Sequence, residues 1–62
     1  EYQQALLLAI DKEKAAFTLY TDLATSIKNE AMQELLISLA QEEAKHRLRL
    51  EVEYDKHFAE EN

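Results

Sequence analysis

The chain has 62 residues with no Gly, Pro or Cys; 47% are hydrophobic, 32% are charged, and the formal net charge is −6. Tight turns between strands usually depend on Gly and Pro, so their absence predicts an all-α fold, while the absence of Cys excludes disulfides and cysteine-ligated metals in this chain and fits a cytoplasmic location. The acidic balance argues against nucleic-acid binding, and the longest apolar run, residues 5–10, is far shorter than the roughly 20 residues that cross a membrane.

The first predicted helix runs from Tyr2 to about Ser26 and is amphipathic. Its apolar side chains recur at heptad-like spacing and form a seam along one face, with Glu13 in the middle. At 100° per residue, most of these side chains lie within about 60° of Glu13. The seam consists of Tyr2, Leu6, Ala9, Glu13, Ala16, Tyr20, Leu23 and Ile27, flanked by Ile10, Phe17 and Ala24.

A joint of about three residues, 27–29, separates the two helices. Asn29 is a favourable N-cap for the second helix. Because no Gly ends the first helix, we expect Lys28 or Asn29 to take the left-handed backbone conformation. So short a joint makes the helices antiparallel neighbours, in which residue i faces roughly residue 57 − i to within about one turn.

The second predicted helix runs from about Glu30 to Phe58, and residues 60–62 are expected to fray. Glu43 and His46 interrupt its apolar seam. An ionised carboxylate in such a setting costs several kcal/mol unless a partner compensates it, and the expected register puts Glu13 at the same height. The seam consists of Met32 (core filler near the joint), Leu36, Leu39, Glu43, His46, Leu50, Tyr54 and Phe58.

Glu43 and His46 form a Glu-x-x-His sequence, whose side chains project from one face of a helix about 5–6 Å apart. A carboxylate and an imidazole so placed are able to bind one metal ion, and Glu13 from the facing helix is able to bridge to a second. One hairpin thus supplies half of a dinuclear site, and two hairpins supply four Glu and two His. Carboxylate-rich sites with one His per metal suit iron or manganese better than zinc.

Two stretches resemble the rubrerythrin branch of the ferritin-like proteins: residues 12–17 (KEKAAF) continuing to Tyr20, and residues 39–46 (LAQEEAKH). A Glu from each of two helices and Glu-x-x-His from the other two is the ligand pattern of ferritin-like di-iron proteins. The resemblance implies that Glu13, Glu43 and His46 are iron ligands, with manganese or zinc possible in place of iron. It also implies that Tyr20 hydrogen-bonds a ligand carboxylate.

By the same resemblance, the chain is an antiparallel hairpin that completes a four-helix bundle with a second hairpin. That partner is another copy of the chain, as in a homo-oligomer, or an N-terminal hairpin of the same protein. The implied chemistry is that of an oxidoreductase coupling Fe(II) oxidation to the reduction of peroxide or dioxygen. The alternative is a ferroxidase that serves iron storage, as in encapsulated ferritins.

The chain departs from full rubrerythrins in three respects. Rubrerythrins carry a further carboxylate one turn before or after the ligand Glu, and here Ile10 and Ala16 stand at those positions. This argues against their redox-linked ligand exchange. The four-cysteine iron domain that brings in electrons is missing, and only one hairpin is present.

A metal-free helical oligomerisation module is the remaining alternative. It would have Glu13 reach water, and would pair Glu43 with Arg47 and Glu42 with His46 within one helix. His57, at i, i+4 from Glu53, is expected to be a plain exposed histidine. A second apolar stripe predicts contacts with other helices under every interpretation; it comprises Leu8, Ala15, Leu19, Ile37, Ala44, Leu48 and Val52.

Overall fold

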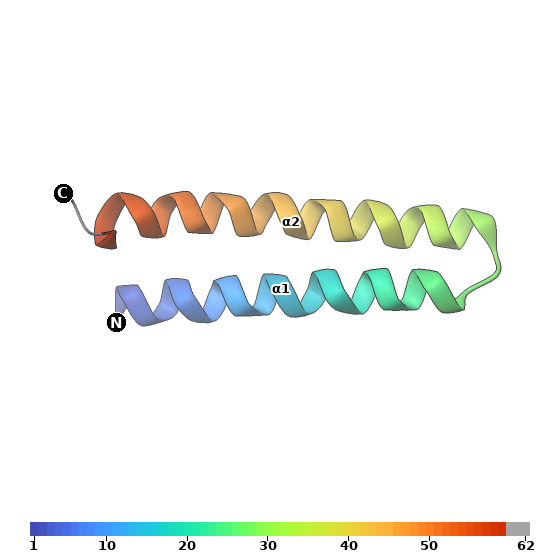
Figure 1. Ribbon diagram of the computed structural model, residues 1–62, viewed down its shortest axis with the longest axis horizontal. Helices are drawn as coiled ribbons and strands as arrows, with labels where there is room; N and C mark the ends of the chain where they lie inside the picture. Colours follow the sequence, from blue (N-terminus) through green and yellow to red (C-terminus); the bar gives the residue numbers. More distant parts are fainter. Residues whose placement is uncertain (60–62) are drawn as a thin grey trace.

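The computed structural model describes residues 1–59, which form two α-helices and no strand. Helix α1 spans Tyr2–Ser26 and helix α2 spans Glu30–Phe58, the bounds that the sequence predicts. The helices lie side by side along their whole length and run antiparallel, so that the start of α1 and the end of α2 lie at the same end of the molecule (Figure 1). The all-α fold class and the helical hairpin are confirmed; the expected fraying of residues 60–62 lies outside the described residues.

Two side-chain hydrogen bonds fix the register of the helices. Gln3 Nε2 donates to the hydroxyl of Tyr54 at 2.9 Å, and Gln33 Nε2 donates to the carbonyl of Ala24 at 3.2 Å. The residue numbers of each pair add up to 57, so the register expected from the short joint is confirmed at both ends of the hairpin.

The joint reverses the chain without a left-handed residue. No residue in the described part of the chain has positive φ; Ile27 and Asn29 are both extended. The expectation that Lys28 or Asn29 would be left-handed is therefore wrong. The reason is Gln33, whose Nε2 donates to the carbonyls of Ala24 and Ile27, at 3.2 and 2.6 Å, and so satisfies the end of α1 that a left-handed cap would otherwise serve.

Asn29 caps α2 as predicted, because its Oδ1 accepts from the backbone N–H of Met32 at 2.9 Å. The acidic Glu30 in the first turn of α2 and the basic Lys56 and His57 in its last turn complement the helix dipole. Local chemistry thus determines where α2 begins and favours where it ends.

The buried core is a narrow strip between the helices, made of Leu6, Ile10, Ala24, Leu36 and Ala40. Three apolar residues of the predicted seams are instead exposed: Tyr2 by 52%, Leu23 by 40% and Met32 by 42%. The flanking positions Ile10 and Ala24 are buried together with Leu6, so the most buried part of α1 lies toward that flank of the seam read from the sequence. Each helix covers only one strip of the other's surface, and the position of that strip decides which apolar residues stay exposed.

Many large apolar side chains remain exposed, on both broad sides of the hairpin. Over residues 1–59, neither helix holds a stretch long and apolar enough to cross a lipid bilayer. The exposed set is Tyr2, Leu7, Leu8, Phe17, Leu19, Leu23, Met32, Leu35, Ile37, Leu48 and Val52.

Candidate metal centre

Glu13, Glu43 and His46 come together midway along the hairpin. One potential ligand atom from each lies within 4.8 Å of those of the other two. His46 Nδ1 is 3.2 Å from Glu43 Oε1 and 3.8 Å from Glu13 Oε2. The two carboxylates are half-buried and the imidazole is more exposed, with side-chain exposures of 23%, 20% and 45% for Glu13, Glu43 and His46. The site therefore opens to one side of the hairpin, the side on which His46 lies.

Helix geometry and register together produce this convergence. Glu43 and His46 are three residues apart on α2 and so share a face. Glu13 comes from α1 at the height that the register assigns it, since positions 13 and 43 add up to 56. No loop takes part, so all three side chains stand on regular helical backbone.

The two carboxylates have opposite pKa shifts. A hydrogen bond with Glu43, then partial burial and the Glu43 charge, raise the pKa of Glu13 above its ordinary value. The hydrogen bond from Glu13 and then the neighbouring His46 lower the pKa of Glu43. Of the two carboxylates, Glu13 is therefore the one that keeps a proton to higher pH, and Glu43 is the one that loses it more readily. A cation that binds both oxygens would compete with that proton.

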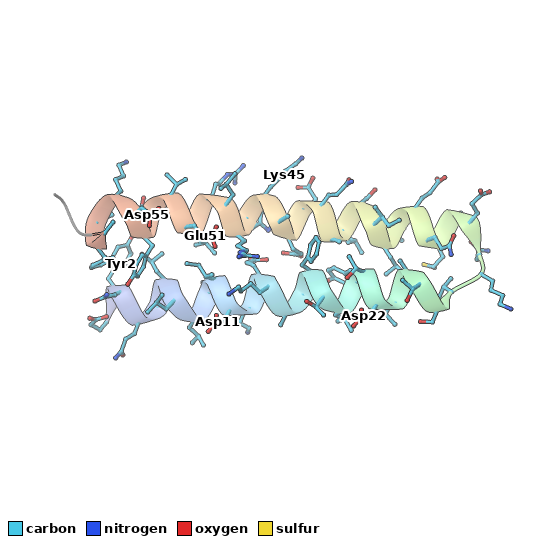
Figure 2. The ribbon with its side chains drawn as sticks, viewed as in Figure 1. Tyr2, Asp11, Asp22, Lys45, Glu51 and Asp55 are labelled. Carbon is cyan, nitrogen blue, oxygen red and sulfur yellow. The ribbon has the colours of Figure 1, made fainter. Side chains whose placement is uncertain are left out.

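The pairings expected of a metal-free helix are absent among the described residues. Arg47 Nε donates to Glu51 Oε2 at 2.9 Å rather than to Glu43, and Lys45 Nζ pairs with Glu42 Oε2 at 3.1 Å. His46 contacts Glu43 and Glu13 instead of Glu42. Figure 2 shows Lys45 pointing away from α1 and Glu51 on the side of α2 that faces α1. Within residues 1–59, His46 is thus the single basic group within 4.0 Å of either site carboxylate.

Tyr20 lies on α1 seven residues after Glu13 and is half-buried. Seven residues correspond to about 10 Å along a helix. Among the hydrogen bonds of residues 1–59 none is made by the Tyr20 hydroxyl, so its role toward a ligand carboxylate stays a prediction.

The donor set fits a divalent transition-metal ion. Two carboxylates and one imidazole are ligands that iron, manganese and zinc accept, and the two carboxylates, once deprotonated, supply two negative charges to balance one divalent ion. Three ligands from one hairpin leave coordination positions free on the open side.

The sequence analysis noted the i, i+4 spacing of Glu53 and His57 but missed Tyr2, which joins them in a polar cluster at the open end of the hairpin. Tyr2, Glu53 and His57 contact one another there. Tyr2 was expected in the apolar seam and His57 as a plain exposed histidine. A signal was available in the spacing, because Tyr2 and His57 each stand eleven residues from a residue of the metal centre, Glu13 and His46.

A helical hairpin with a Glu on one helix and Glu-x-x-His on the other has the ligand pattern of two of the four helices of ferritin-like di-iron proteins. The family model described as Rubrerythrin matches residues 4–62, nearly the whole chain, and the chain belongs to this family. No curated protein and no solved structure matches the chain significantly. The resemblance noted in residues 12–20 and 39–46 is therefore confirmed at the level of the family.

Proposed function

We propose that two hairpins of this kind enclose a di-iron centre, and that the protein is an oxidoreductase that couples Fe(II) oxidation to the reduction of peroxide or dioxygen. The observation that carries the proposal is the convergence of Glu13, Glu43 and His46, with their ligand atoms within 4.8 Å, in a chain of the rubrerythrin family. The absence of Cys supports a cytoplasmic location.

In this proposal Glu13 and Glu43 bind the ions through their carboxylates and His46 binds one through an imidazole nitrogen. Bound iron supplies the electrons for reduction of the oxidant. Metal binding would displace whatever proton Glu13 holds, because its pKa is the raised one of the pair and metal ligands bind deprotonated. Tyr20 orients a ligand carboxylate. Manganese or zinc would satisfy the same donor set.

The partner hairpin is proposed to be a second copy of the chain, or an N-terminal hairpin of the same protein, and it would cover the side of the molecule on which His46 lies. Leu35 is exposed and stands eleven residues, about three turns, before His46, and so on the same side. Met32 and Leu39, which is half-buried, continue that apolar surface. Covering it would bury apolar area and exclude water from the metal centre.

Metal analysis of anaerobically purified protein tests the site. We expect about one iron per chain by elemental analysis, since each hairpin carries half of a two-ion site. Fe(II) at about 100 times its Kd should raise the melting temperature by roughly 10 °C or more. Glu43→Ala should abolish both effects, whereas Glu42→Ala, its exposed neighbour, should leave them unchanged. A chain that takes up no iron, or melts alike with and without it, contradicts the proposal.

A ferroxidase for iron storage is the second candidate function. The observation that favours it is Ile10, which is buried in the core, 8% exposed, at a position where rubrerythrins carry a further carboxylate. Comparing peroxide turnover with iron mineralisation in one preparation separates the two functions. Peroxide turnover without mineral growth supports the oxidoreductase, and mineral growth with slow peroxide turnover supports storage.

A further inference from the structure

A second group of potential metal ligands lies at the open end of the hairpin. The Tyr2 hydroxyl donates to Glu53 Oε2 at 2.6 Å, and His57 Nε2 lies 2.9 Å from the same oxygen. Tyr2 sits between the ends of the two helices (Figure 2). Two polar groups, one from each helix, thus converge on one carboxylate oxygen of Glu53, entirely within one chain.

This cluster repeats the geometry of the metal centre three turns away. Tyr2 stands eleven residues before Glu13, and His57 stands eleven residues after His46. Eleven residues are about three helical turns, or roughly 16 Å, so both steps keep the same face of the helix. Because the helices are antiparallel, both steps also lead away from the joint and to the same height. Glu53 corresponds to Glu43: it precedes His57 by four residues, whereas Glu43 precedes His46 by three.

The surroundings of the cluster favour a charged carboxylate and a fixed imidazole. The hydrogen bond from Tyr2, followed by the nearby His57 and Lys56 charges, lowers the pKa of Glu53. Donating that bond raises the pKa of Tyr2, which keeps its phenol neutral. The rings of Tyr2 and Phe58 flank the His57 ring, with centroids 5.8 and 6.1 Å away. Glu53 and His57 are therefore suited to act as ligands, and Tyr2 to position the carboxylate.

We propose that Glu53 and His57 bind a divalent transition-metal ion, separate from the centre at Glu13, with Tyr2 positioning the Glu53 carboxylate. A tetrahedral zinc ion about 2.1 Å from an oxygen and a nitrogen holds them about 3.4 Å apart, so Glu53 Oε2 and His57 Nε2, which are 2.9 Å apart, would separate by about half an ångström to admit it. The site needs neither a second hairpin nor iron. A bound ion would tie the start of α1 to the last turns of α2.

Zn²⁺ titration of the untagged chain tests this site, with the first centre removed by replacing Glu13, Glu43 and His46 with Ala. We expect one Zn²⁺ per chain by calorimetry. Adding Tyr2→Phe should weaken binding at least tenfold, as the loss of a hydrogen bond that positions a ligand predicts, and adding His57→Ala, which removes a ligand, should weaken it more. Asp55→Ala, an exposed acid on the same turns, is the matched control and should change nothing.

A titration of the unaltered chain, followed through the imidazole NMR signals of His46 and His57, keeps the test valid if the multiple variant does not fold. Zn²⁺ should shift the His57 signals in the wild type but not in Glu53→Gln. Zinc binding that disappears with the first centre, or that His57→Ala leaves intact, overturns the proposal. The iron content of the wild type and of Glu43→Ala tests the first centre separately, so either proposed site can be contradicted without the other.

Discussion

At the scale of single residues, the two carboxylates of the metal centre differ although both are glutamates. Glu13 keeps its proton to higher pH, because it donates a hydrogen bond to Glu43 and stands beside its charge. Glu43 loses its proton more readily, because it accepts that bond and faces His46. The difference arises from the contact between the helices, since both residues belong to the same chemical type.

The metal-free protein should become less stable as pH rises through the raised pKa of Glu13. A carboxyl whose folded pKa is raised stabilises the fold while protonated, and that contribution is lost as pH rises above its ordinary value of 4.5. Glu43 acts in the opposite sense, losing its contribution only as pH falls through its lowered pKa. The melting temperature of the wild type, measured with a chelator present, should therefore decline as the pH rises above 4.5. Glu13→Gln should remove the decline; an equal decline in the variant would show that Glu13 is not the proton carrier.

Glu13→Gln should have the opposite consequence when metal is present. The neutral amide relieves repulsion in the metal-free chain but supplies no charge to an ion. Fe(II) or Mn(II) binding should weaken by more than the 10- to 100-fold that loss of a residue supporting a ligand costs. Calorimetry under anaerobic conditions measures this change. Equal affinities of the variant and the wild type would rule out Glu13 as a ligand.

At the scale of elements, α1 ends without a glycine or a basic residue in its last turn. Gln33 replaces both by reaching back from α2 to the carbonyls of Ala24 and Ile27. This contact ties the end of one helix to the second turn of the other. The relative heights of Glu13 and Glu43 follow from the register that it helps to set.

Gln33→Ala should destabilise the hairpin by about 1–2 kcal/mol, since it leaves two part-buried carbonyls without their donor. For a chain of this size the loss corresponds to roughly 4–8 °C in melting temperature per kcal/mol. Circular dichroism of the metal-free variants measures it. Gln41→Ala, at an exposed position on the same helix, is the control and should melt like the wild type or slightly higher. Equal melting of both variants would mean that water serves the joint equally well.

At the scale of the whole molecule, the hairpin buries one strip and leaves apolar side chains on two sides. Only five hydrophobic residues in the described part are buried, against eleven large ones that are exposed. A domain of about 60 residues has little stability to spare. The proposed second hairpin on the side of His46 would both cover the exposed surface there and complete the coordination of an ion at the candidate metal centre.

Leu35→Lys should disrupt self-association and iron retention together. Leu35 and His46 lie on one side of α2, and a charge there would oppose burial against another copy. We expect the dissociation constant of the assembly to rise at least tenfold by analytical ultracentrifugation. Leu48→Lys is the matched control, because Leu48 is equally apolar and exposed but lies two residues, about 200°, from His46. If Leu48→Lys lowers the iron content and Leu35→Lys does not, the interface beside the metal ligands does not lie on the side of Leu35.

The sequence by itself determined the two helices, their antiparallel arrangement, the register and the meeting of Glu13 with Glu43 and His46. Periodicity, the Asn29 cap and a short joint are local properties, and they leave few alternatives for a hairpin. Only the tertiary structure decided how far each helix turns about its own axis, which buried Ile10 and Ala24 and exposed Met32. It also decided the opposite pKa shifts of the two glutamates and the Tyr2–Glu53–His57 cluster. These depend on distances between side chains of different helices, and such distances follow from how their volumes pack.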